Sequence, residues 1–290
     1  MEGPQATNLR QRIAAVGWSL AVLAVGYFAT VTGVVWVFRA LASRVPTLVQ
    51  GQVGPSLIQA VVGVAVFVPL SLFVGRHRLL LTSAELGWVP ARIGVPGFGK
   101  GLLVAGLMGI GAVVAGIAAH SSWTGDGGSV GSYLVRVPML SLVLLPAALF
   151  EEVAFRGLLV VGLVRGLGRP LGVGVAAMLF AAAHRNNPDV TPLALGNIAL
   201  AGIFLGATFL ARGGLWTATG AHLGWNLTLA GLGAPVSGLP FEIPWIDFNP
   251  GALAWLTGGL FGPEGGLLAT VALIAGTVVV TRWQAFQEER

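Results

Sequence analysis

The sequence predicts an all-α, polytopic membrane helical bundle, and three observations carry this prediction. Of the 290 residues, 55% are hydrophobic and only 9% are charged, whereas a soluble domain has roughly 25% charged residues. The mean hydropathy is high, at +0.84. Apolar stretches of about 18 residues or more recur along the chain, and that length allows a helix to cross a bilayer. We therefore expect a single integral membrane domain over residues 1–290.

About eight transmembrane helices are expected from the apolar stretches. They lie at residues 13–38, 56–75, 101–119, 137–164, 171–184, 192–211, 215–232 and 265–281. The fourth stretch is long and the fifth is short for a single crossing. Glycine is abundant, with 44 residues, as is typical of helices that pack closely in lipid. Cysteine is absent, which excludes disulfides and thiolate chemistry.

The basic residues predict the orientation of the chain. With a cytoplasmic N-terminus, 11 of the 16 Lys and Arg residues fall inside, 4 fall outside, and Arg156 lies within the membrane. This bias predicts that both termini are cytoplasmic. Residues 233–264 then form an extracytoplasmic loop, whose Pro and Trp content predicts a partly ordered cap. Because the cations are dispersed, the high pI indicates membrane topology and contact with lipids, and no nucleic-acid partner is expected.

Two adjacent glutamates in the fourth stretch are the first candidate site residues. Glu151, Glu152 and Arg156 lie in apolar sequence, where ionisable groups are costly and usually functional. Glu152 and Arg156 are four residues apart, so they can pair on one helix face, either as a structural clamp or as support for a site. Glu151 points about 100° away around the helix and lacks this partner, which makes it the better candidate base.

Two histidines and an asparagine follow on later stretches. His184 ends the fifth stretch, with Phe180 one turn earlier, and His222 and Asn226 share one face of the seventh. Each residue alone could simply join helices or sit at the interface. Together with the glutamates they make up nearly all the polar groups at membrane depth. A carboxylate with an imidazole can activate water, and His with Asn can stabilise an oxyanion, so the set indicates a hydrolase.

The order of these residues resembles a known family. Glu151-Glu152-Val-Ala-Phe-Arg156, Phe180-Ala-Ala-Ala-His184 and His222-Leu-Gly-Trp-Asn226 are similar to the motifs of the CAAX prenyl endopeptidase and bacteriocin-processing (Abi, CPBP) intramembrane proteases. The resemblance covers about residues 137–232, which would be the catalytic core helices. The segment of residues 81–88 is similar to a short element found upstream in this family.

The resemblance implies a role for each motif residue. Glu151 and His184 would activate water, and His222 with Asn226 would bind the oxyanion. The supporting residues would be Glu152, Arg156 and Phe180. The substrate would be a peptide or protein, with or without an attached lipid. A metal is left open: Glu151, His184 and His222 could be three ligands of a divalent ion such as Zn²⁺, although the His-Glu-x-x-His helix is missing.

One feature conflicts with straight helices. Glu151 would lie about 21 Å below the outer end of the fourth span, whereas His184 would lie near the outer end of the fifth. We expect that the fifth helix is broken, or that the loop of residues 185–191 re-enters and lines a hollow, or that the span ends or the topology differ from those assigned here.

Other readings of the sequence remain. The chain could be a catalytically silent, family-like membrane scaffold or immunity protein, or a proton-coupled transporter that uses buried Glu and His. His77 and His120, without acidic neighbours, are expected to have no role in a site. The Gly- and Ala-rich composition suggests a bacterial plasma membrane.

Overall fold

The computed structural model describes residues 8–51, 53–283 and 286. Helices dominate this part of the chain, as the composition predicts. In chain order the α-helices are α1 (Leu9–Ala42), α2 (Val53–Arg78), α3 (Ala91–Ala115), α4 (Val130–Glu152), α5 (Leu158–Leu167), α6 (Arg169–Ala183), α7 (Pro192–Phe209), α8 (Leu215–Gly231), α9 (Ala254–Thr257) and α10 (Leu267–Arg282). The shorter helical segments are η1 (Pro46–Leu48), η2 (Gly116–Ala119), η3 (Val153–Gly157), η4 (Gly259–Phe261) and η5 (Pro263–Gly265).

Five helical segments of the described chain are long and apolar enough to cross a membrane. They are α1, α2, α3 with η2, the run from Val130 to Leu167, and α7. The helices α6 and α10 are apolar but have only 15 and 16 residues. The chain is therefore an integral membrane protein with several candidate spans. The predicted number of eight also included α6, α8 and α10, which are shorter than a full crossing requires.

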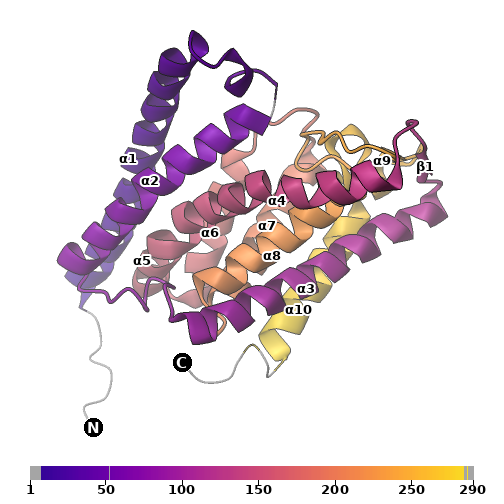
Figure 1. Ribbon diagram of the computed structural model, residues 1–290. Coiled ribbons are helices and arrows are strands. Elements are labelled where there is room, and N and C mark those ends of the chain that lie inside the picture. The colour runs from indigo at the N-terminus through magenta and orange to yellow at the C-terminus, as the bar shows by residue number, and fades with distance from the viewer. Residues whose placement is uncertain (1–7, 52, 284–285, 287–290) are drawn as a thin grey trace.

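Helix α8 lies at the centre of the bundle and is buried along most of its length. It contacts α3, α4 and α7, as Figure 1 shows. Helix α3 lies so close to α8 that a Cβ atom at Gly220 or Gly224 would collide with the α3 backbone at Phe98 or Leu102. Small residues allow this approach in lipid. His222 and Asn226 follow these glycines by two residues and so point to the other side of α8.

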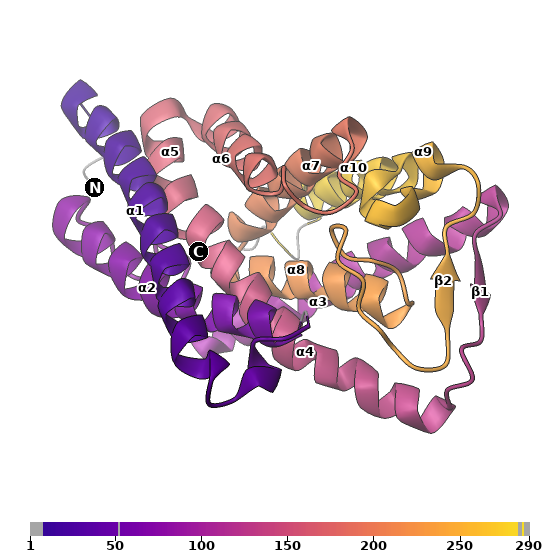
Figure 2. The ribbon, with the colours of Figure 1, turned by 90° about the horizontal axis from the view of Figure 1, so that it is seen from above.

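The loop of residues 233–264, which we call the cap, is ordered. Its strand β2 (Asp247–Asn249) pairs antiparallel with β1 (Ser122–Thr124), placing Trp123 opposite Phe248. The Nε1–H group of Trp123 donates to the carbonyl of Leu232 at 2.8 Å, which ties β1 to the end of α8. Figure 2 shows the two strands on the opposite side of the molecule from α1 and α2. The cap thus covers one end of the central helices.

Candidate active site

The two glutamates lie where the fourth helix changes its hydrogen-bonding pattern. They are the last two residues of α4, and the π-helical turn η3 follows directly. All five residues of this turn are buried, including Arg156. Turns of this kind are rare and are frequent at functional sites. The long fourth stretch of the sequence is therefore two helices, α4 and α5, joined at the glutamates.

Glu152 is the centre of a buried ionic network. Its Oε1 atom lies 3.2 Å from Nη1 of Arg156 and accepts a hydrogen bond from Nδ1 of His222 at 2.7 Å. The exposed fractions of Glu152 and Arg156 are 0% and 2%. The guanidinium of Arg156 also lies 4.1 Å from the centre of the Phe180 ring. The ion pair that the four-residue spacing predicts is present, and it also orients an imidazole.

Glu151 faces the two histidines. Its Oε2 atom is 3.8 Å from Nε2 of His184 and 3.8 Å from Nε2 of His222. These distances are too long for direct hydrogen bonds and leave room for a shared water molecule. Among the described residues, Oε2 has no hydrogen-bond partner although the atom is buried. Glu151 is also the more accessible glutamate, with a side chain 27% exposed.

The end of α6 fixes the orientation of His184. Its backbone N–H donates to Ala181, and its Nδ1 atom lies 2.8 Å from the carbonyl oxygen of Phe180. Because a carbonyl oxygen only accepts, Nδ1 must carry the proton. The Nε2 atom is then the ring nitrogen that faces Glu151, 3.8 Å from its Oε2 atom. The Phe180 ring packs against both imidazoles, with centroid distances of 4.6 Å to His184 and 6.2 Å to His222.

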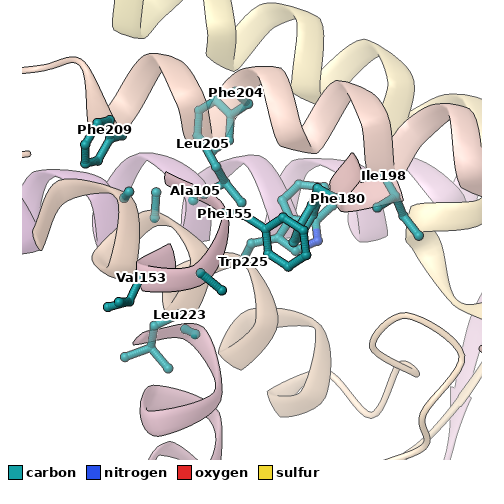
Figure 3. Packing of buried hydrophobic residues seen from close by; sticks show 14 of the residues in the cluster. Ala105, Val153, Phe155, Phe180, Ile198, Phe204, Leu205, Phe209, Leu223 and Trp225 are labelled. Carbon is teal, nitrogen blue, oxygen red and sulfur yellow. The ribbon is translucent and has the colours of Figure 1, made fainter. Parts of the chain in front are cut away.

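Figure 3 shows the apolar packing behind this site. Phe155 from η3 and Phe180 from α6 meet edge to face, with centroids 5.3 Å apart. Ile198 from α7 and Trp225 from α8 lie beside them and belong to the same buried core. The rings of η3 and α6 thus hold the backbone that carries Glu152 and His184. The charged side chains of the site therefore project from a closely packed apolar surface.

A cavity of about 260 Å³ opens in front of the site. Glu151, His184, His222 and Asn226 all line it. Asn226 is the next residue along the inner face of α8 after His222. The sequence analysis grouped these four residues as one candidate site, and in the structure all four line the same cavity. The sequence analysis missed other polar residues of the cavity wall: Tyr27, Ser56, Gln59 and Ser237.

The depth conflict of Glu151 and His184 is resolved by a hairpin. From Glu151 the chain runs 16 residues to Leu167, and from Arg169 it returns over 15 residues to His184. The two legs are nearly equal in length, so His184 returns to the level of Glu151. The expected break in the fifth helix is wrong: α6 is continuous, and the break lies in the fourth, at η3. The loop after α6 does line the cavity, through Asn187.

The sequence analysis also missed a buried acid, Glu264. Its Oε1 atom accepts from Nε1 of Trp225 at 3.1 Å, and its Oε2 atom accepts from the backbone N–H and the hydroxyl of Ser237. Burial raises the pKa of the Glu264 carboxyl. Trp225 precedes Asn226, and Ser237 is a cap residue that lines the cavity. Glu264 therefore joins α8 and the cap beside the site.

Backbone geometry shows how tightly the cap is held at this point. Ser237 has a φ of +50°, which is uncommon for a residue with a side chain. At the next position, a Cβ atom on Gly238 would collide with the carbonyl of Pro188. The amide of Asn187 donates to the Ser237 carbonyl at 2.8 Å. The turn is thus fixed between Glu264 and the loop that follows His184.

The residues do not form a recognisable metal centre. No group of three or more His, Cys, Asp or Glu within the described chain is arranged to hold an ion. The three ligands considered from the sequence, Glu151, His184 and His222, surround a gap in which both Nε2 atoms lie 3.8 Å from one carboxylate oxygen. His77 and His120 do not line the cavity.

Comparison with known proteins agrees with the motifs. No curated protein and no solved structure matches the chain significantly. Residues 133–228 match a family model, described as Type II CAAX prenyl endopeptidase Rce1-like. The match begins in α4 and ends in α8, so it contains both glutamates, both site histidines and Asn226. Residues 133–228 therefore form a domain of the Rce1-like type II CAAX prenyl endopeptidase family.

Proposed function

We propose that this chain is an intramembrane endopeptidase that hydrolyses a peptide bond near the membrane surface. The observation that carries the proposal is the convergence of two imidazole Nε2 atoms on one Glu151 oxygen, at 3.8 Å each, beside an open cavity. This arrangement suits a water molecule held by a general base. The family domain of residues 133–228 supports peptide substrates.

The first step is activation of water. Glu151 accepts one proton of the water, and the other proton is directed to Nε2 of His184. The water oxygen then attacks the scissile carbonyl carbon, and the carbonyl π electrons move to its oxygen. Glu151, now a carboxylic acid, later gives its proton to the leaving nitrogen as the C–N bond breaks. His184 orients the nucleophile because its Nδ1 atom is held by the Phe180 carbonyl.

The second requirement is a pair of donors for the oxyanion. Asn226 supplies an amide N–H, and His222 supplies Nε2–H. Because Nδ1 of His222 already donates to Glu152, the ring must carry both protons to act in this way. The Glu152 carboxylate stabilises this charged form and is itself held by Arg156. Glu264 has a positioning role, since it fixes the cap and the residue before Asn226.

The surrounding membrane and the substrate complete the proposal. The bundle lies in a bacterial plasma membrane with both termini cytoplasmic and with α6, α8 and α10 also within the bilayer. Residues 137–232 are the catalytic core, and the cap is extracytoplasmic. The substrate is a peptide or protein segment, with or without an attached lipid, which reaches the cavity between α2, α4 and the cap. These assignments rest on the distribution of charged residues and on the residues that line the cavity.

The test uses the purified full chain in lipid nanodiscs with a panel of membrane-anchored peptides, prenylated and unmodified. We expect cleavage by the native protein and its loss in Glu151→Ala and His222→Ala. His77→Ala is the matched control, because His77 lies outside the cavity, and it should cleave normally. Cleavage that persists in both site variants refutes the assignment. A native chain that binds but never cleaves these peptides instead indicates a silent scaffold.

A further inference from the structure

A second cavity lies far along the bundle from the proposed active site. It has a volume of about 230 Å³ and lies where α1 begins and where α2 and α5 end. Three arginines line it, one from each helix: Arg12, Arg78 and Arg165. No acidic side chain is among its lining residues. The cavity therefore concentrates positive charge at one end of three membrane helices.

The three guanidinium groups are held in place by the protein. The Nε atom of Arg12 donates to the carbonyl of Gly166 at 2.9 Å, which leaves its two terminal amino groups without partners among the described residues. Arg78 lies 5.1 Å above the ring of Trp18. Arg165 donates to the carbonyl of Leu79 at 3.2 Å. Anchored arginines lose less conformational freedom when they bind an anion.

Only one of the three charges is neutralised. Arg165 forms an ion pair with Glu85 at 2.8 Å, whereas Arg12 and Arg78 have no carboxylate partner in the described part of the chain. Capping of helix carbonyls explains one contact of Arg12 and one of Arg165. It does not explain why Arg12 and Arg78, which lack a carboxylate partner in the described residues, both border an open cavity. A phosphate group fits this pattern, because guanidinium forks bind it with paired hydrogen bonds.

The rim of the cavity is apolar. Leu80, two residues after the end of α2, lines the cavity and is 85% exposed. Its φ of +53° is rare for a bulky residue, so the chain holds this side chain outward at a conformational cost. Trp18, which stacks under Arg78, is also 38% exposed. An anion that carries hydrocarbon chains can bind the arginines and contact the apolar rim at the same time.

We propose that this cavity binds the phosphate headgroup of an anionic glycerophospholipid. Arg12 and Arg78 contact the phosphate, Arg165 borders it, and Leu80 and Trp18 contact the acyl region. Basic pockets between membrane helices are suited to such headgroups. This site is separate from the cavity of Glu151 and does not depend on the proposed peptidase reaction.

The experiment measures binding of short-chain phosphatidylglycerol to the full chain in neutral detergent. Short-chain phosphatidylcholine and inorganic phosphate are the comparison ligands. We expect Arg12→Gln with Arg78→Gln to weaken phosphatidylglycerol binding by about 25-fold, on the basis of about fivefold for each arginine. The matched control changes Arg10 and Arg76 to Gln, which removes equal charge two residues away from each site residue. Thermal melting checks that both double variants remain folded.

Three outcomes overturn the proposal. Equal weakening by the two double variants means that the effect is general surface charge. Binding of inorganic phosphate as tightly as phosphatidylglycerol indicates a free-anion site instead of a lipid site. Equal binding of phosphatidylcholine and phosphatidylglycerol by the native protein means that the arginines do not select an anion. This last comparison needs no variant, so it remains decisive if Arg12 or Arg78 proves necessary for folding.

Discussion

The two neighbouring glutamates provide a sharp test, because the same substitution should destabilise the fold at Glu152 and leave its stability nearly unchanged at Glu151. Glu152→Gln removes the carboxylate that lies 3.2 Å from Arg156 and 2.7 Å from His222. Glu151→Gln removes a carboxylate that has no direct hydrogen bond to either histidine. The two variants differ by one position and make the same chemical change.

The expected magnitudes follow from burial. Arg156 is 2% exposed, so after Glu152→Gln its charge is compensated only by the Phe180 ring and by Glu151. Breaking a buried ion pair on one side costs about 3–5 kcal/mol, and the amide oxygen that Gln retains can recover about 1 kcal/mol through a hydrogen bond. We therefore expect Glu152→Gln to lower the free energy of unfolding by about 2–4 kcal/mol. For Glu151→Gln we expect a change of less than about 1 kcal/mol.

Both variants should lose activity, so the melting temperature is the measurement that separates them. Loss of a general base lowers kcat by about 10²–10⁴-fold, so Glu151→Gln should be nearly inactive while it melts like the native protein. Glu152→Gln should melt earlier and should also lose activity, because His222 loses its partner. The assays are thermal melting and peptide cleavage in the same nanodiscs. A Glu151→Gln protein that retains cleavage, or a Glu152→Gln protein that melts like the native chain, refutes the division of roles.

Three further predictions concern the cap and the chemistry. Glu264→Gln leaves an amide N–H facing a donor of Trp225 or Ser237, so one hydrogen bond is lost. A loss of about 1.4 kcal/mol of positioning energy should lower kcat/KM by about tenfold. The control is Glu242→Gln, which changes an exposed acid of the cap, and equal effects of the two variants would contradict a positioning role of Glu264. Because burial raises the pKa of Glu264, the folded chain keeps this proton to higher pH than the unfolded chain does, so stability should fall as pH rises above about 4.3. Between pH 4 and 8, the melting temperature of Glu264→Gln should fall less steeply with pH than that of the native chain. Equal slopes for the two proteins would exclude this contribution of Glu264. Cleavage should survive treatment with a strong chelator, because Glu151 takes the proton directly; activity that is lost and restored only by added zinc would disprove this route.

Much of the site could be predicted from spacing alone. The four-residue interval predicts the pairing of Glu152 with Arg156, and it places His222 and Asn226 on one side of α8. These are local properties of a helix, so a sequence contains them. The relative depth of Glu151 and His184 is different, because it depends on where a helix turns back. Apolar sequence looks the same in a full crossing and in a short hairpin leg such as α5.

Glu264 could not be found in this way. It lies 38 residues after Asn226, in a loop without helical periodicity, where an isolated acid usually faces water. Its importance comes from three donors on Trp225 and Ser237 that only the folded cap brings together. The cavity wall from α1 and α2 was missed for the same reason, since Tyr27 and Gln59 form no motif with the later helices.

The balance of charges in the site also explains how an apolar bundle can contain ionised side chains. With His222 doubly protonated, the charges of Glu151, Glu152, Arg156 and His222 sum to zero, which limits the cost of removing them from water. In the proposed reaction Glu151 accepts a proton from the attacking water, and the four side chains together become positive by one unit. The oxyanion formed in the same step is negative by one unit and lies against His222 and Asn226. The site and substrate therefore remain neutral in the proposed reaction. Substitution of either glutamate disturbs this balance before any substrate binds, at lower cost for Glu151 because its side chain is 27% exposed.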